Sequence, residues 1–348
     1  MTESARPVYL SGVAARTAFG DHAGLVAGAF AGEPAFAPVT RFSTVGRRTE
    51  HAATLPGSPD LVDELVGVIE RACPGPRASV PLLLAAHADA GSRALAREVS
   101  ARTGVAGVSR VYTGACVAAT SAVADAATMI STGRADRVLV AAGYLVEPST
   151  FALFDAGRAL SRDGRLRPFS LGRQGMLLGD GVAAVLLEAH STTPLARLAG
   201  WSRSGDAYHV CKPKPDGTGL ARAITGAADR AGVSISDIDY VNANGTGTTF
   251  NDEAEVAALT LVGLDRTPVS STKSVHGHAL EASGLVELVT TVLASGEGVL
   301  PVNANYLGAD PTCALDLVVE PRRARMGYAL TVNAAFGGAN TALLLEAA

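Results

Sequence analysis

The feature that most constrains the fold is an alternation of short apolar runs with longer amphipathic stretches along the chain. Runs such as "VPLLLAAHA", "DRVLVAAG" and "GVAAVLLEA" have the length and composition of buried strands. Between such runs, apolar residues recur at spacings of three and four, as they do in helices. The pattern is typical of an α/β fold. Helices are expected over residues 22–31, 61–72, 90–103, 116–132, 218–231, 250–262 and 280–295.

The end of the first half of the chain is similar to the end of the second. "GDGVAAVLLEA" runs to about residue 189, and "GANTALLLEAA" closes the sequence. Each is a Gly-rich turn followed by an apolar strand. The repeat predicts two similar halves, 1–189 and 190–348, with a site at their junction. Chance recurrence of two strand ends remains the alternative.

Composition narrows the class of protein. With 348 residues, 48% of them apolar and 18% charged, the chain can bury a sizeable core and is not expected to be disordered. The net charge of −4 gives no reason to expect nucleic acid or an anionic membrane as a partner. No apolar run approaches the roughly 18 residues of a spanning helix, and the N-terminus lacks a signal-peptide pattern. Four dispersed cysteines without CxxC spacing favour a reduced, cytoplasmic setting with no disulfide or metal site.

Cys116 stands where the strand-like "SRVYT" gives way to a helical run. The helix dipole and free N–H groups at a helix start favour an anion, so we expect a lowered thiol pKa at this position. The same N–H groups could hold the oxyanion formed when a thiolate attacks a thioester. From this segment alone, a small structural cysteine under a tight turn remains the alternative.

Six segments together resemble the β-ketoacyl synthases of the thiolase-like superfamily, in the order and at the distances of that family. They are "GACVAATSAVADAATMISTGRADRVLVAAG", "RPFSLGRQGMLLGDGVAAVLLE", "DAYHVCKPKPDGTG", "VNANGTGTTFNDEAE", "STKSVHGHALEASGLVE" and "NAAFGGANTALLLE". The resemblance is almost continuous over 107–348. It implies a duplicated βαβαβαββ fold in five layers, α-β-α-β-α, which agrees with the suspected repeat.

The resemblance also implies roles for individual residues. Cys116 matches the nucleophile that accepts an acyl chain from a thioester, and the backbone N–H groups of Cys116 and Phe336 match the oxyanion hole. Phe336 also matches the gate of the acyl pocket. Thr246 and Thr248 match the threonines that hydrogen-bond a phosphopantetheine arm. Their other role would be to cap the helix that follows.

The family's supporting residues and partners are implied in the same way. His278 matches the second active-site histidine, and Lys273 and Glu287 match the ion pair that orients it. The substrates would be thioesters of an acyl carrier protein or coenzyme A, with no separate cofactor. A homodimer is expected from the family, and a heterodimer with another ketosynthase is the alternative.

One position departs from the family pattern. Chain-extending ketosynthases have a histidine before the "GTGT" run, where this chain has Asn244. Asparagine can donate a hydrogen bond through its amide, but it neither titrates nor carries charge near neutral pH. Stabilisation of the enolate formed by malonyl decarboxylation should therefore be weakened. His276 could supply the missing imidazole, but its position favours a solvated loop histidine.

Three functions follow from these residues. The leading prediction is a ketosynthase-like acyltransferase that loads Cys116 and passes the chain on, in polyketide or fatty-acid-type biosynthesis. The second is a decarboxylative β-ketoacyl synthase using Cys116, Asn244 and His278. The third is a non-catalytic partner subunit that shapes a chain-length pocket, which Asn244 favours and the retained cysteine disfavours.

Overall fold

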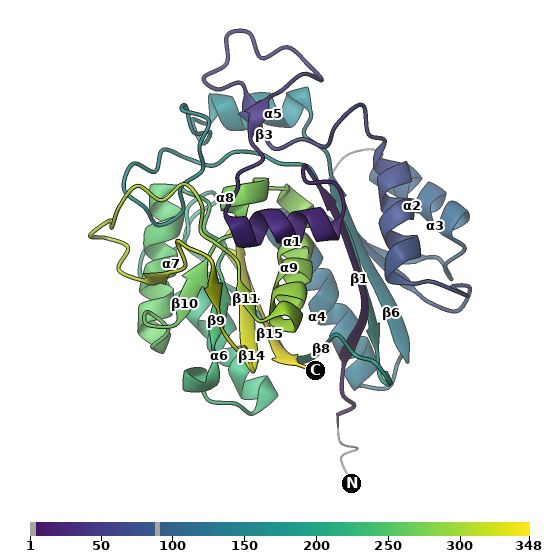
Figure 1. Cartoon of the computed structure of the whole chain (residues 1–348). Coiled ribbons are helices and arrows are strands. Elements are labelled where there is room, and N and C mark those ends of the chain that lie inside the picture. Colours follow the sequence, from purple (N-terminus) through teal and green to yellow (C-terminus); the bar gives the residue numbers. More distant parts are fainter. Residues whose placement is uncertain (1–4, 88–90) are drawn as a thin grey trace.

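The computed structural model describes residues 5–87 and 91–348, and its spine is one 11-stranded sheet (Figure 1). The strand order is β12-β10-β9-β14-β15-β8-β1-β7-β6-β4-β5. The strands of the first half are β1 (Tyr9–Thr17), β4 (Leu82–Ala85), β5 (Val108–Tyr112), β6 (Arg137–Tyr144) and β7 (Gly181–Glu188). Those of the second are β8 (Ala196–Gly205), β9 (Tyr240–Asn242), β10 (Pro268–Ser270), β12 (Asp316–Leu317), β14 (Tyr328–Ala335) and β15 (Ala339–Ala347).

Helices divide the molecule into layers on both sides of the sheet. The α-helices are α1 (His22–Ala31), α2 (Leu61–Ala72), α3 (Ser92–Thr103), α4 (Ala118–Ser131), α5 (Pro148–Ala156), α6 (Thr218–Ala231), α7 (Thr249–Val262), α8 (Lys273–His276) and α9 (Ser283–Glu297). The short 3-10 turns are η1 (Ala115–Val117), η2 (Ile235–Asp237) and η3 (Leu280–Ala282). Two-residue strands form small outlying pairs: β2 (Ala37–Pro38) with β3 (His51–Ala52), and β11 (Val299–Leu300) with β13 (Arg322–Arg323).

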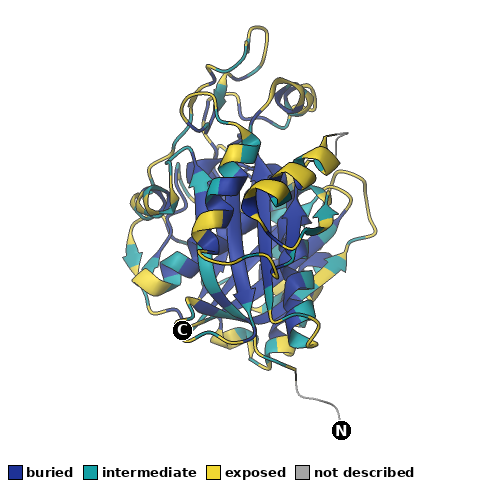
Figure 2. Cartoon of the chain, turned by 90° about the vertical axis from the view of Figure 1, so that its right-hand side faces the viewer, coloured by how far each residue is buried: buried dark blue, intermediate teal, exposed yellow. Residues whose placement is uncertain are grey.

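The order of the layers follows from the packing of these helices. Helix α2 packs on β1, β6 and β7, with α3 beside it, and α6 packs on β8 and β15, with α7 beside it (Figure 1). Helices α4 and α9 lie between the two halves and contact strands of both. The result is helix, sheet, helix, sheet, helix, which is the five-layer α/β arrangement that the resemblance implied. Figure 2 shows the buried residues gathered along the central strands and the helices between them.

The two halves of the sheet are joined by a short contact. Strands β1 and β8 pair antiparallel only through Tyr9 with Arg197 and Leu10 with Ala196. The twist of each half leaves room for α4 and α9 between them, because adjacent strands rotate steadily in one sense. The boundary placed at residues 189 and 190 falls between β7 and β8, and it stays a prediction.

Local signals explain which helices were predicted well. Helices α1, α2 and α6 have the expected bounds. Asp21 and Asp60 cap the first two through their side chains, and Gly32 ends α1 with a positive φ of 67°. The helix expected at 90–103 begins at Ser92, and residue 90 lies outside the described residues. The expected helices over 116–132 and 280–295 each begin with a 3-10 turn, and α5 and α8 were not predicted.

No helix in the described part of the chain is both long and apolar enough to cross a membrane.

Candidate active site

The candidate nucleophile lies at the carboxyl end of a parallel strand. Strand β5 ends at Tyr112, η1 carries Cys116, and α4 begins at Ala118. Ala115 has a φ of 51°, a conformation that a residue with a side chain rarely adopts. This tight turn places Cys116 between the strand and the helix, with 9% of its surface exposed. Carboxyl ends of parallel strands are the usual location of ligand sites in α/β proteins.

Cys116 and His278 lie within hydrogen-bond distance, although 162 residues separate them in the sequence. Nε2 of His278 lies 3.2 Å from Sγ of Cys116, and Nδ1 lies 2.7 Å from Oγ of Ser283. Burial and the nearby positive charge of Lys273 hold the pKa of His278 well below its usual value, so the imidazole is neutral. If Nδ1–H donates to Ser283, Nε2 is free to accept the thiol proton.

The expectation of a lowered thiol pKa at Cys116 is wrong. Burial raises the pKa of Cys116 to about 12, and the opposing effect of the Lys273 charge is smaller. The negative charge of Glu281 raises it further. Removal of the thiol from water therefore affects its pKa more than its position at the start of a helix does. The resting pair is a neutral thiol beside a neutral imidazole, and a thiolate forms only as the proton moves to His278.

This charge state predicts an acylation rate that is flat across neutral pH. The imidazole stays neutral because its pKa lies well below 6.5, and the thiol stays protonated because its pKa is about 12. Between about pH 6 and pH 8 we expect the rate of Cys116 acylation to change less than about threefold. Intact-protein mass, measured after the reaction is quenched at fixed times across that pH range, tests this acylation rate. A tenfold rise for each pH unit would instead show reaction through a pre-formed thiolate.

Asn244 lies beside this pair, and both ends of its carboxamide are held. Oδ1 accepts from Nζ of Lys273 at 3.2 Å, and Nδ2 donates to Oδ1 of Asn251 at 2.8 Å. Its backbone carbonyl also accepts from Lys273, at 2.7 Å. One amide hydrogen of Asn244 thus remains for a ligand in the cavity. The group can donate a hydrogen bond there but cannot carry a proton.

The Lys273–Glu287 pair is fully buried, with Nζ 2.6 Å from Oε1. The resemblance implied that this pair orients His278, but the hydrogen bonds run differently. Lys273 donates hydrogen bonds to Asn244 and forms its ion pair with Glu287, whereas the hydrogen bonds of His278 join it to Ser283 and Cys116. In this chain the ion pair positions Asn244, and Ser283 positions the histidine.

Two buried carboxylates hold the loop that carries Asn244, and sequence reasoning missed both. Glu255 accepts from the N–H groups of Asn244 and Gly245 at 2.7 and 2.8 Å. Asp252 accepts from the N–H groups of residues 246 and 247, at 3.2 Å each. Burial raises the pKa of Glu255 to about 7 and that of Asp252 to about 6. Their spacing in "NDEAE", on the first turns of α7, was the available signal.

A cavity of about 550 Å³ opens over Cys116, His278 and Asn244. Thr246 and Thr248 line it, and their hydroxyl oxygens lie 2.8 Å apart. Phe336 also lines it from the turn between β14 and β15, half exposed and stacked on Phe154 with ring centroids 6.1 Å apart. Around one cavity, the structure thus brings together the candidate nucleophile, the histidine, the asparagine, the two threonines and the candidate gate that were predicted from the sequence. The roles of the threonines and of the oxyanion N–H groups stay predictions.

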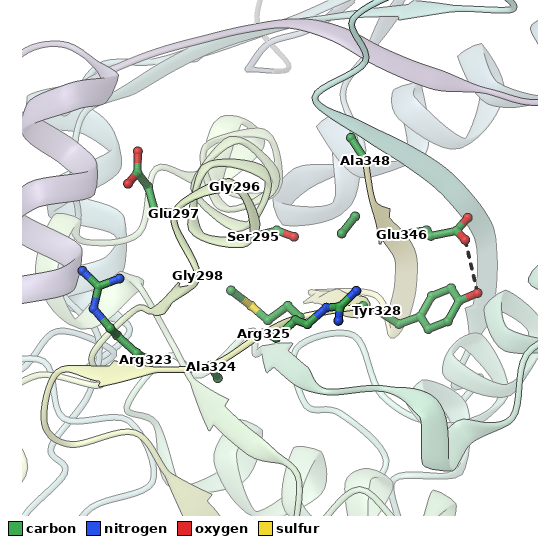
Figure 3. Close-up of a pocket in the computed structure, with 13 residues that line it drawn as sticks. Ser295, Gly296, Glu297, Gly298, Arg323, Ala324, Arg325, Tyr328, Glu346 and Ala348 are labelled. Carbon is green, nitrogen blue, oxygen red and sulfur yellow. Dashed lines mark hydrogen bonds between the residues drawn. The ribbon is translucent and has the colours of Figure 1, made fainter.

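A second hollow, of about 750 Å³, lies at the end of α9 beside β14 and β15 (Figure 3). Arg323, Arg325, Glu297 and Glu346 line it, so its charges are of both signs. It shares no lining residue with the cavity over Cys116. It is therefore not part of the candidate active site.

The placement expected for His276 is wrong. His276 is fully buried, and its Nε2 lies 3.1 Å from Oγ1 of Thr272. Burial lowers its pKa to about 3, so it is neutral. It does not line the cavity over Cys116, and so it does not replace the imidazole absent at Asn244.

Comparisons with known proteins agree with this geometry. Residues 83–193 match the model of the β-ketoacyl synthase N-terminal domain, and residues 195–307 match that of the C-terminal domain. The chain is 38% identical over 266 residues to nodulation protein E of Rhizobium meliloti, covering 73% of this chain and 65% of that protein. It is 38% identical over 267 residues to the tetracenomycin polyketide synthase ketoacyl synthase alpha subunit of Streptomyces glaucescens, covering 72% and 63%.

Solved structures show the same fold over nearly the whole chain. The ishigamide ketosynthase/chain length factor structure superposes with a TM-score of 0.88 at 26% identity, covering 99% of this chain and 100% of that one. A β-ketoacyl synthase from Burkholderia phymatum gives a TM-score of 0.90 at 24% identity, which supports the fold alone. The chain belongs to the β-ketoacyl synthase family, and its fold is thiolase-like. The matches span a little under two thirds of the two curated relatives.

Proposed function

We propose that this protein is a ketosynthase-like acyltransferase. It takes an acyl chain from an acyl-carrier-protein or coenzyme A thioester onto Cys116 and passes the chain to an acceptor. The observation that carries the proposal is the 3.2 Å contact between Cys116 Sγ and His278 Nε2. A nucleophile and a base within hydrogen-bond reach, with a third group (Ser283) on the base, are the parts that covalent acyl transfer needs.

The chemistry needs no group beyond those at the site. The Cys116 proton moves to His278 Nε2 as sulfur attacks the thioester carbonyl, and a carbon–sulfur bond forms. The tetrahedral oxyanion would be held by the N–H groups of Cys116 and Phe336. The bond to the pantetheine sulfur then breaks, and that sulfur takes the proton from His278. In the second half, the acceptor gives its proton to His278, attacks the acyl-enzyme, and releases Cys116 as a thiol.

Chain extension requires the site to stabilise an enolate, whereas loading does not. Decarboxylation of a malonyl thioester develops an enolate, and a lost oxyanion donor costs roughly 2.7–4 kcal/mol. Asn244 offers only one free amide N–H, because its other amide hydrogen and its side-chain oxygen are bound to Asn251 and Lys273. An amide also carries no positive charge. Loading of Cys116 does not use Asn244. Transfer without extension is therefore the function that the site supports best.

The test is intact-protein mass after incubation with acyl- and malonyl-carrier thioesters. We expect an acyl adduct on the wild-type protein, none on Cys116→Ala, and only slow loss of carbon dioxide from the malonyl thioester, without a β-keto product. The release of carbon dioxide together with a β-keto product would overturn the assignment of transfer without extension. Absence of any adduct would overturn loading itself and favour a non-catalytic partner subunit.

A decarboxylative synthase is the second candidate, and one observation favours it. The buried Lys273–Glu287 pair is intact and bound to Asn244, so the electrostatic support of that position is kept. In this alternative Cys116, Asn244 and His278 would act together in condensation. The malonyl arm of the test above separates the two candidates.

The proposed partners are an acyl carrier protein and a second ketosynthase-type subunit. Strand β5 ends the sheet and has a neighbour on one side only, which leaves an edge available for pairing. The similarity to the tetracenomycin polyketide synthase subunit supports a pathway of polyketide type, and a fatty-acid-type pathway is the alternative. The ishigamide ketosynthase/chain length factor structure supports a heterodimer, and the homodimer expected from the family stays a prediction.

A further inference from the structure

The cavity over Cys116 carries a positive charge that the proposed chemistry does not use. Three cationic side chains line it, those of Arg158, Arg173 and Lys212, and no aspartate or glutamate of the described residues does. The whole chain, by contrast, has a formal net charge of −4. A cavity lined by one sign of charge concentrates ligands of the opposite sign. The ligand of this cavity is therefore expected to carry an anionic group.

Two of the three cations have no partner of opposite charge. Arg173 forms ion pairs with Asp310 and Glu253, neither of which lines the cavity. Arg158 and Lys212 form no ion pair with any carboxylate in the described part of the chain, and both residues are exposed. These two side chains are free to bind an anion that enters the cavity.

The ammonium of Lys212 lies at the start of a helix, where a cation is unfavourable unless an anion lies beside it. Its Nζ is 4.2 Å from the centre of the Phe250 ring, and Phe250 is the second residue of α7. Residues 248–251 all line the cavity, and no described side chain caps the first N–H groups of this helix. Those N–H groups and the helix dipole also attract an anion.

The acidic residues on the first turns of α7 do not supply that anion. Asp252 is fully buried and accepts from the backbone N–H groups of Phe169 and of residues 246 and 247. Glu253 is bound to Arg173. Neither carboxylate lines the cavity. The negative charge has to come from the ligand.

Arg158 reaches the same cavity from the end of α5. It follows Gly157, which ends that helix, and has a φ of 56°. Glycine usually occupies this left-handed position after a helix, because a side chain is unfavourable there. The chain thus carries a guanidinium into the cavity at a position where the backbone alone favours glycine.

The two free cations lie at the exposed end of the cavity and not beside the nucleophile. Cys116 and Thr246 are only 9% and 5% exposed. Phe250 is 59% exposed, and Arg158 and Lys212 are exposed as well. A thioester that reacts with Cys116 has its carbonyl at the buried end, so the far end of its pantetheine arm lies at the exposed end. That arm has amide and hydroxyl groups along its length and is charged only at its terminal phosphate.

We propose that Arg158, Lys212 and the first N–H groups of α7 bind the phosphate of a phosphopantetheine arm whose thioester reacts with Cys116. The proposal rests on the acyltransferase function above and assigns a binding site to one part of its substrate. Guanidinium, ammonium and backbone N–H groups all donate hydrogen bonds, and phosphate oxygens accept them. A carrier protein and coenzyme A both contain this phosphate, so either source has the required chemistry.

The experiment compares substrates that differ only in this phosphate. Cys116 acylation of the wild-type protein is followed by intact mass over a range of concentrations, with acetyl and hexanoyl thioesters of phosphopantetheine and of pantetheine. We expect kcat/KM to be roughly tenfold higher with the phosphate, because each exposed charge contributes a factor of a few. The difference should lie in KM, since the phosphate is remote from the reacting carbonyl.

The possible failures of this experiment are distinguishable. Equal kcat/KM with and without the phosphate would overturn the phosphate site and leave the acyltransferase standing. No loading of any of the four thioesters would overturn the acyltransferase, and the phosphate site with it.

Two substitutions test the named side chains. Lys212→Met removes the ammonium but keeps an apolar chain over the Phe250 ring, and Arg158→Gly suits the positive φ, so the fold should be kept in both. Each should lower the preference for the phosphate by about threefold. Lys214→Met, outside the cavity, is the matched control and should keep the preference. A preference that survives both cavity substitutions in folded protein would overturn the proposal.

One further comparison separates the two sources of the phosphate. Hexanoyl-coenzyme A and the hexanoyl form of a polyketide-type acyl carrier protein are each used as the acyl donor, and the one with the lower KM is identified as the preferred source. For that donor, Lys212→Met should raise KM by about threefold. An unchanged KM would overturn the phosphate site.

Discussion

Replacing Lys273 by methionine is expected to lower the free energy of unfolding by about 3–5 kcal/mol, the loss typical of a broken buried ion pair. Lys273 and Glu287 have no exposed side-chain surface. Without the ammonium, Glu287 keeps one hydrogen bond, from Nδ2 of Asn333 at 2.6 Å. Burial already raises the pKa of Glu287, so the variant should protonate this carboxyl group rather than bury its charge. Urea unfolding followed by far- and near-ultraviolet circular dichroism measures the loss.

Two further variants control this result. Lys214→Met breaks a partly exposed pair with Asp216, 2.8 Å apart, and should cost no more than about 1 kcal/mol. Lys273→Met combined with Glu287→Leu removes both charges and should recover part of the stability, because no unpaired ion is left. A loss in Lys273→Met no larger than that in Lys214→Met would show that the buried pair does not stabilise the fold.

Most of the fold could be predicted from local pattern. Helix α2 combines apolar spacing with a capping aspartate before its first turn, whereas the almost wholly apolar α1 is marked by a capping aspartate and a glycine at its end, so the bounds of both were recovered without tertiary information. Helix α5 was missed because its sequence, "PSTFALFDA", has no amphipathic periodicity, and tertiary packing decides its structure. The contact between β1 and β8 that joins the two halves involves two residue pairs, too few to leave a signal in the sequence.

The residues that form the site could be predicted from the sequence, but their pKa values could not. The resemblance to the β-ketoacyl synthases identified Cys116, Asn244 and His278, and the structure brings these three residues to one cavity. The thiol pKa could not be predicted, because it depends on the depth of burial rather than on the helix start. His276 was misplaced for a similar reason, since nothing in "SVHGH" distinguishes a buried imidazole from a solvated one. Contacts across the chain, such as His278 with Ser283, became visible only in three dimensions.

Asn244 is more constrained than a simple loss of histidine would suggest. Its backbone N–H is bound by Glu255, its carbonyl by Lys273, and its carboxamide by Lys273 and Asn251. The residue is therefore held in one orientation, with a single N–H left for the ligand. The backbone contacts do not depend on the side chain, so a substitution at this position should leave the loop in place.

Restoring a histidine at this position is expected to restore enolate stabilisation. In Asn244→His, an imidazole N–H would face the cavity, and the Lys273 ammonium would remain beside it. We expect decarboxylation of a malonyl thioester to rise by roughly tenfold to a thousandfold, up to the full effect of one oxyanion donor. Loading of Cys116 should stay within about threefold of wild type, because His278 accepts the thiol proton in both. Carbon dioxide release and intact-protein mass measure the two activities separately.

Asn244→Ala is the matched control for this substitution. It removes the remaining N–H but keeps the backbone contacts to Glu255 and Lys273, so loading should persist and decarboxylation should fall below wild type. A graded order of histidine, asparagine and alanine would show that hydrogen-bond donation at this position sets the rate of decarboxylation. Equal decarboxylation by all three proteins would contradict this and locate the limit on extension elsewhere. If the wild-type rate already matched that of Asn244→His, the Cys116, Asn244 and His278 set would suffice for condensation, and the acyltransferase assignment would give way to the synthase.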